Sequence, residues 1–208
     1  KSIGITGIDL IGPEEWPILK KHNLTSSMCN GAEISLTEGW NDKQYHGVLV
    51  DNYLNHIDLV AAAGYQNLIC FSGNRRNIDN ETGMNNCVEG LKKILGHAEK
   101  KGVMIQMELL NSKIDHEDYM CDNSKWGFEL CRRLDSNNFK LLYDIYHMQI
   151  NEVSVICFNT FRRLKFCFFF IIYLTLLLIT TLCNSLLDNL FKYSPNLSFP
   201  PKETSHFF

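Results

Sequence analysis

The sequence predicts an α/β domain with a parallel sheet, and three observations lead to this prediction. Short apolar runs alternate with helical patterns in the order βαβαβαβαβ. Over most of the run the expected strands recur about every 30 residues, the length of a βαβ repeat. They also lack a clean period of two, as expected of strands buried on both faces. The leading architecture is an incomplete (β/α)8 barrel with about five of its eight strands, and the alternative is an open doubly wound sheet.

Helix-start and helix-stop signals place the elements of the N-terminal half. Pro13 and the acidic Glu14 and Glu15 mark the first helix, because proline suits a first turn and acids favour the positive end of the helix dipole. Gly64 should cap the second helix, since glycine adopts the left-handed conformation of a C-cap. The expected order is a strand at 5–10, a helix to about residue 22, a strand at 24–28, a helix over about 47–63 and a strand at 67–71.

The next segment, 72–80, is rich in turn residues and should be a loop. It lacks the GxGxxG and GxxxxGK patterns, so no phosphate-binding loop is expected. An amphipathic helix follows and should stop at Gly102, because Cys87, Leu91 and Ile94 recur at helical spacing before it. The remaining elements are a strand at 103–109, a helix at 125–134 and a strand at 139–144.

The composition changes sharply after Glu152. Residues 1–152 contain all 13 glycines, with 21 acidic and 15 basic side chains, whereas residues 153–208 contain no Gly or Ala, ten of the 13 Phe, two acids and five bases. The acidic balance of the first segment argues against general nucleic-acid affinity. We therefore expect a partial barrel domain at 1–152 and a separate tail at 153–208.

Two hypotheses account for the tail. Residues 166–183 form 18 residues without a charge, which meets the lower bound of about 17–25 residues for a membrane span. Arg162, Arg163 and Lys165 precede this run, so an anchor would leave the barrel in the cytoplasm. The favoured hypothesis is a translated intron, because Gly and Ala require G/C-rich codons and Val153-Ser154 can be encoded by GTAAGT or GTGAGT, a common intron start.

The intron hypothesis predicts the structure of the mature transcript. The message should join the codon of Glu152 directly to codons for a Gly-containing strand–helix run with a late strand-end Glu. Sequencing the transcript across Glu152 and Val153 measures this. A mature message that keeps Val153 onward would instead favour a membrane-anchored half-barrel without catalytic activity.

The eight cysteines bear on the cellular compartment. They are scattered without a CxxC pair, so free buried thiols in a reducing compartment are expected. The chain starts at Lys1 rather than Met and opens without a signal-peptide pattern, so we expect the natural N-terminus to precede it. The predicted localisation is cytoplasmic, and the alternative is membrane-anchored with the barrel part in the cytoplasm.

Three polar residues near two neighbouring strand ends are the main candidates for chemistry. Glu108 and Asp144 end the expected strands at 103–109 and 139–144. Function in parallel barrels lies at the carboxyl ends of strands, so both carboxylates should face one cavity and hold Mn²⁺ or Mg²⁺ between them. His147 could bind the metal or a substrate hydroxyl. The structural alternatives are an inward salt bridge for Glu108 and an ordinary loop role for His147.

The motifs around these residues resemble a known family. Met107-Glu-Leu-Leu-Asn111 and Asp144-Ile-Tyr-His-Met-Gln149, with Asp118–Asp122 and Trp126–Cys131 between them, are similar to the xylose isomerase-like TIM-barrel superfamily, and most of all to hydroxypyruvate isomerase-family proteins and ketose 3-epimerases. The resemblance covers roughly residues 3–152. It implies a divalent-metal-dependent isomerase or epimerase that moves a proton next to a carbonyl through a cis-enediolate.

The resemblance also assigns roles. The strand at 5–10 matches the family's second strand. Glu108 therefore becomes the metal ligand on the family's fifth strand and an acid/base residue, and Asp144 becomes the metal ligand on its sixth. His147 becomes a contact to a small hydroxy-carbonyl compound or sugar. The family's further ligands, on strands 7 and 8, have no counterpart here, so we expect the chain as printed to be inactive. Alternatives are a non-catalytic, membrane-anchored half-barrel binding protein, and a dehydratase or endonuclease of the same superfamily.

Other polar residues are weaker candidates for substrate binding. Arg75 follows the strand at 67–71 and could grip an anionic substrate, although such residues are more often part of a solvated loop. Lys113, Asp115 and His116 follow Glu108 and could line the pocket mouth.

Overall fold

The computed structural model describes residues 2–152, which form a five-stranded parallel sheet with helices between the strands. The membrane-span and intron hypotheses for the tail therefore lie outside the described residues. The elements are β1 (Gly7–Ile11), α1 (Trp16–Lys21), β2 (Thr25–Cys29), a 3-10 turn (Lys43–Tyr45), α2 (His46–Ala63), β3 (Asn67–Cys70), α3 (Asn80–Lys101), β4 (Met104–Glu108), α4 (Ser124–Leu134), β5 (Phe139–Leu142) and α5 (Ile145–Glu152).

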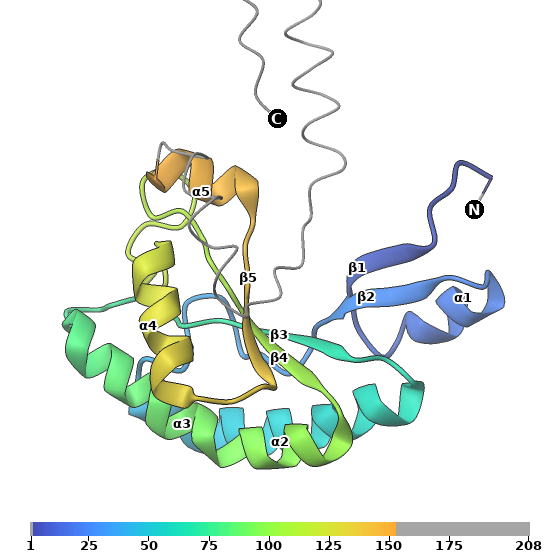
Figure 1. Cartoon of the computed structure of the whole chain (residues 1–208), viewed down its shortest axis with the longest axis horizontal. Coiled ribbons are helices and arrows are strands. Elements are labelled where there is room, and N and C mark those ends of the chain that lie inside the picture. The colour runs from blue at the N-terminus through green and yellow to red at the C-terminus, as the bar shows by residue number, and fades with distance from the viewer. Residues whose placement is uncertain (1, 153–208) are drawn as a thin grey trace, which may run out of the picture. The chain divides into compact units, whose positions relative to one another are not determined.

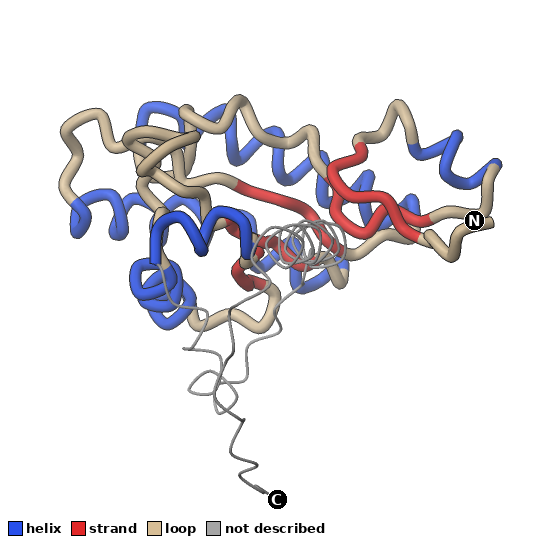
Figure 2. The backbone as a smooth tube through the Cα atoms, turned by 90° about the horizontal axis from the view of Figure 1, so that it is seen from above, coloured by secondary structure: helices blue, strands red, loops and turns tan. Residues whose placement is uncertain are grey.

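The strand order decides between the two predicted architectures. The strands lie side by side in the order β1-β2-β3-β4-β5, all parallel. A doubly wound sheet reverses its order at a switch point, whereas a barrel keeps sequence order. Helices α2, α3 and α4 lie along the sheet, with β1–β2 at one end and β5–α5 at the other (Figures 1 and 2). The fold is therefore TIM-barrel-like, and the doubly wound alternative is wrong.

Local capping signals explain the lengths of the helices. Gly64 and Gly102 end α2 and α3 with φ of 81° and 70°, a left-handed conformation that suits glycine. Asp79 begins α3 by accepting hydrogen bonds from the backbone N–H of Glu81 and Thr82. Asn123 caps α4 in the same way through the N–H of Trp126. Both N-caps satisfy donors that the first turn of a helix leaves unpaired.

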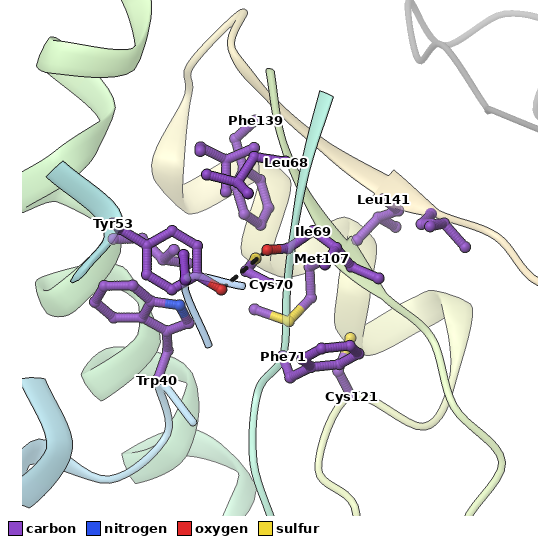
Figure 3. Packing of buried hydrophobic residues seen from close by; sticks show 14 of the residues in the cluster. Trp40, Tyr53, Leu68, Ile69, Cys70, Phe71, Met107, Cys121, Phe139 and Leu141 are labelled. Atoms are coloured by element: carbon purple, nitrogen blue, oxygen red, sulfur yellow. Dashed lines mark hydrogen bonds between the residues drawn. The ribbon is translucent and has the colours of Figure 1, made fainter. Parts of the chain in front are cut away.

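The outer side of the sheet packs against helices in a large apolar core. Tyr53 of α2 lies against Trp40 and donates a hydrogen bond to the carbonyl of Ile69, 2.9 Å away (Figure 3). Met107 of β4 is fully buried in the same core. The predicted buried free thiols are confirmed for the described cysteines, which are Cys29, Cys70, Cys87, Cys121 and Cys131.

Alternate residues of the strands carry buried polar groups. Gln106 donates to Asn67 Oδ1 at 2.9 Å, and Asn67 donates to the carbonyl of Ser27 at 2.8 Å. Successive side chains of a strand point to opposite faces, so Glu108 shares the face of Gln106 while Met107 faces the helices. A polar row across β2, β3 and β4 thus leads to Glu108 at the carboxyl end of β4.

The order of strands and helices is confirmed, but the start of the first helix was predicted too early. Helix α1 begins at Trp16, so Pro13 and Glu14 lie before it, Glu15 is its N-cap, and no acidic residue lies in its first turn. Two further elements were missed. These are the 3-10 turn before α2 and helix α5, which begins directly after Asp144. The eight residues of α5 have little amphipathic pattern, and only Met148 is buried. Among residues 2–152, no helix is both long and apolar enough to cross a membrane.

Candidate metal centre

Glu108 ends β4 with its side chain almost completely buried. The residue is 8% exposed, and its pKa is raised to about 8, first by burial and then by the negative charge of Asp144. A salt bridge to a core Lys or Arg would lower this pKa. The raised pKa of Glu108 therefore fits a buried carboxyl group without a cationic partner. It does not fit the inward salt bridge that the sequence left as the alternative.

Asp144 lies at the matching end of the neighbouring strand. Glu108 pairs with Leu142 in the β4–β5 register, and Asp144 follows two residues later. One oxygen of Asp144, Oδ1, accepts the backbone N–H of Tyr146 at 2.8 Å at the start of α5. The other oxygen, Oδ2, lies 3.8 Å from Nε2 of His147. The start of α5 thus orients the Asp144 carboxylate toward His147.

Glu108, Asp144 and His147 form a possible metal site. Each offers one donor atom, and these atoms all lie within 4.8 Å of one another. Ligand atoms about 2.1 Å from one ion lie at most about 4.2 Å apart, so a small inward movement brings the set into range. Two carboxylate oxygens suit Mn²⁺ or Mg²⁺, and an imidazole also suits transition metals. The raised pKa of Glu108 fits this donor set, because a bound cation would offset the repulsion between the carboxylates of Glu108 and Asp144.

His147 lies on α5 with its ring half-buried. Burial lowers its pKa, the charge of Asp144 partly opposes that shift, and nearby His116 adds to it. The rings of His116 and His147 have centroids 5.2 Å apart. The structure therefore brings together four of the residues singled out in the sequence: Glu108, Asp144, His147 and His116.

Arg75 is engaged by the loop between β4 and α4. Its guanidinium donates to the backbone carbonyls of Tyr119 and Met120 and lies 3.3 Å from a carboxylate oxygen of Asp122. These contacts bind the guanidinium within the fold. Its role in gripping an anionic substrate stays a prediction.

Lys113 contacts the end of α5. Its ammonium donates to the carbonyls of Ile150 at 3.3 Å and Asn151 at 2.6 Å. The neighbouring Glu152 accepts hydrogen bonds from the backbone N–H and hydroxyl of Ser124. The β4–α4 loop and α5 therefore hold each other in place, and a substrate role for Lys113 stays a prediction.

Sequence reasoning missed the roles of Asn111 and Tyr146 beside His147, although it named Asp115 as a residue of the pocket mouth. Asn111 donates to His147 Nδ1 at 2.7 Å and to Asp115 Oδ2 at 2.7 Å, and Tyr146 donates to the same Asp115 oxygen at 2.8 Å. The spacing Glu108-x-x-Asn111 was visible in the sequence. The hydrogen bond between Asn111 and His147, 36 residues further on, was not visible there.

Comparisons with known proteins agree with this fold. The family model described as xylose isomerase-like TIM barrel matches residues 16–166. The D-psicose 3-epimerase of Ruminiclostridium cellulolyticum is 30% identical over 80 residues, which are 38% of this chain and 26% of that protein. The chain thus matches about a quarter of the length of this curated relative.

Solved structures are similar at the level of the fold. D-psicose 3-epimerase with D-tagatose, from Clostridium cellulolyticum H10, has a TM-score of 0.59 at 18% identity and covers 74% of this chain and 58% of its own. An AP endonuclease, family 2, from Brucella melitensis has a TM-score of 0.63 at 20% identity, with coverages of 80% and 67%.

A third solved structure was determined with a metal ion. The IOLI protein with a binding zinc atom has a TM-score of 0.58 at 14% identity, and the likeness covers 70% of this chain and 55% of that one. The family model spans well over half of the sequence, including Glu108 at the end of β4 and Asp144 just after β5. The chain therefore belongs to the xylose isomerase-like TIM barrel family.

Proposed function

We propose that residues 2–152 form the substrate- and metal-binding part of a divalent-metal-dependent sugar isomerase or epimerase of the hydroxypyruvate isomerase type. The observation that carries the proposal is the meeting of Glu108, Asp144 and His147 at the carboxyl ends of adjacent strands, within 4.8 Å. Two kinds of named relative add support: D-psicose 3-epimerase, similar both in sequence and in its solved structure, and L-ribulose 3-epimerase. The substrate is a small hydroxy-carbonyl compound or sugar.

The roles follow from the chemistry of each residue. Glu108 and Asp144 would hold Mn²⁺ or Mg²⁺, which when bound polarises the carbonyl and hydroxyl oxygens of a substrate. Glu108 also takes the proton from the carbon next to the carbonyl and returns it, because burial keeps its carboxylate basic. His147 contacts a substrate oxygen. Removal of that carbon-bound proton leaves an enediolate, and its return by Glu108 to the neighbouring carbon gives isomerisation. Epimerisation also requires a second acid/base residue on the opposite face, a role that the resemblance gives to the Glu on the family's strand 8.

An endonuclease is the second activity to weigh, because one structural neighbour is named an AP endonuclease. A multi-zinc site needs several His and carboxylate groups. Within residues 2–152, the group of three possible ligands found contains one His. A Mn²⁺-dependent cleavage of abasic-site DNA by the purified chain would favour the endonuclease over the isomerase.

Metal binding tests the proposed centre directly. Titration of the 208-residue chain with Mn²⁺, followed by electron paramagnetic resonance of the free ion, should show one site that EDTA empties. Asp144→Asn should weaken binding about 100-fold, because the amide loses the negative charge that attracts the cation. Asp58→Asn is the control, since Asp58 is an exposed carboxylate on α2 paired with Lys101. Equal affinities in all three proteins would contradict the proposed metal centre.

The activity itself is tested on the spliced product predicted above. With Mn²⁺ it should isomerise hydroxypyruvate or epimerise a ketohexose, and EDTA should abolish turnover. Full activity in a Glu108→Gln variant of that product would show that Glu108 is not the acid/base residue.

A further inference from the structure

The amide of Asn111 makes four hydrogen bonds beside the proposed centre. Asn111 is fully buried, three residues after Glu108. Its Oδ1 accepts the backbone N–H groups of Ile114 at 3.2 Å and Asp115 at 2.9 Å. Its Nδ2 contacts Asp115 Oδ2 and His147 Nδ1, each at 2.7 Å. The amide is thus held on every side, which fixes the direction of each hydrogen bond.

The chemistry of these partners identifies the oxygen and the nitrogen of the amide. Rotating it by half a turn would place its oxygen against the Asp115 carboxylate and its NH₂ against two backbone N–H groups. Both arrangements are repulsive, because they pair acceptor with acceptor and donor with donor. Asn111 therefore donates to His147, and the Nδ1 atom of His147 must accept with its lone pair.

Asp115 holds this donor in place. Its Oδ2 accepts from Asn111 and also from the hydroxyl of Tyr146, at 2.8 Å. Tyr146 precedes His147 on α5, and the two rings form a T-shaped pair with centroids 5.1 Å apart. A chain of hydrogen bonds thus connects the start of α5, through the loop after β4, back to the imidazole.

We propose that Asn111 is a positioning residue that fixes His147 in the neutral tautomer with its proton on Nε2. This nitrogen lies 3.8 Å from Asp144 Oδ2, on the side of the metal centre. A protonated ring nitrogen has no lone pair for a cation, and a metal-binding His ordinarily donates from its other nitrogen, which here accepts. His147 therefore acts as a hydrogen-bond donor to a substrate oxygen, and the metal is held by Glu108 and Asp144.

The substrate role rests on the proposed function, whereas the tautomer does not. Nitrogen-15 NMR of the full chain with labelled histidine measures the tautomer, with His147→Gln to assign the signal. We expect a proton on Nε2 and a bare Nδ1. A signal with the proton on Nδ1 would overturn the proposal.

A charge-conserving exchange gives the decisive variant. In Asn111→Asp/Asp115→Asn, position 111 still accepts both backbone N–H groups, but its other oxygen now requires a donor from His147. The proton should move to Nδ1. Asn86→Ala, which removes a buried amide of α3 that donates to the carbonyl of Asn41, should leave the His147 signal unchanged. Retention of the Nε2 proton in the exchange variant would overturn the proposal.

A single substitution covers the case in which the exchange variant does not fold. Asn111→Ala removes the donor without adding charge, so His147 should populate both tautomers. A signal that stays entirely in the Nε2–H form would show that Asn111 does not fix the tautomer.

The affinity for Mn²⁺ shows whether His147 is a metal ligand or a substrate contact. His147→Gln should change the Kd for Mn²⁺ by less than about threefold, whereas Asp144→Asn should raise it about 100-fold. Equal losses in both variants would make His147 a ligand and overturn the proposal. A chain that binds no Mn²⁺ would overturn the proposed metal centre, and the NMR measurement would still decide the role of Asn111.

Discussion

Glu108→Gln is expected to stabilise the metal-free chain at alkaline pH while it weakens Mn²⁺ binding about 100-fold. The pKa of buried Glu108 is raised to about 8 from 4.5. In the folded protein the neutral acid is therefore favoured, and glutamine mimics that neutral form. The metal requires the ionised carboxylate, which glutamine cannot supply.

The raised pKa of Glu108 also sets the direction in which the free energy of unfolding changes with pH. A raised pKa in the folded state means that the folded protein binds more protons than the unfolded chain between pH 4.5 and about 8. The contribution of Glu108 to the free energy of unfolding is thus fully present below pH 4.5 and is lost as pH rises from 4.5 to about 8, by at most about 1.4 kcal/mol per pH unit. Glu108→Gln should remove this slope.

Urea unfolding of the metal-free wild type and variant between pH 5 and 9 measures the difference. Glu99→Gln is the control, because Glu99 lies on the exposed surface of α3. The prediction fails if Glu108→Gln and wild type show parallel pH profiles. Mn²⁺ binding to the wild type should also release about one proton at pH 7, which unbuffered titration detects.

Arg75→Met is expected to lower the free energy of unfolding by about 2–4 kcal/mol. The guanidinium donates to the carbonyls of Tyr119 and Met120 and pairs with the largely buried Asp122. Its removal leaves these acceptors without their donor and loosens the loop that carries Asn111. Thermal and urea unfolding measure the loss.

Arg76→Met is the matched control at the next position. Arg76 is exposed, and its side chain contacts the hydroxyl and ring of Tyr45 at the surface, so the expected cost is at most about 1 kcal/mol. Equal stability of both variants and the wild type, with weaker binding of an anionic sugar only in Arg75→Met, would instead support the substrate-gripping role predicted from sequence.

Local signals in the sequence were sufficient for most of the fold. Capping glycines such as Gly64 and Gly102 act within one turn of their helix, so they can be recognised without tertiary contacts. The regular βαβ spacing implies a parallel sheet for the same reason. Helix α5 was missed because it is short and packs only Met148 into the core, so its apolar pattern is weak.

The sequence by itself determined the α/β class with a parallel sheet and the nearness of Glu108 to Asp144, because both follow from periodicity and from residues at strand ends. The strand order, which only the tertiary structure shows, decided for the barrel over the doubly wound sheet. Only the tertiary structure decided what surrounds the two carboxylates. Asn111 meets His147 across 36 positions, and Arg75 meets Tyr119 across 44. Such contacts depend on how loops from separate βα units pack together, and no local pattern of residues encodes that arrangement.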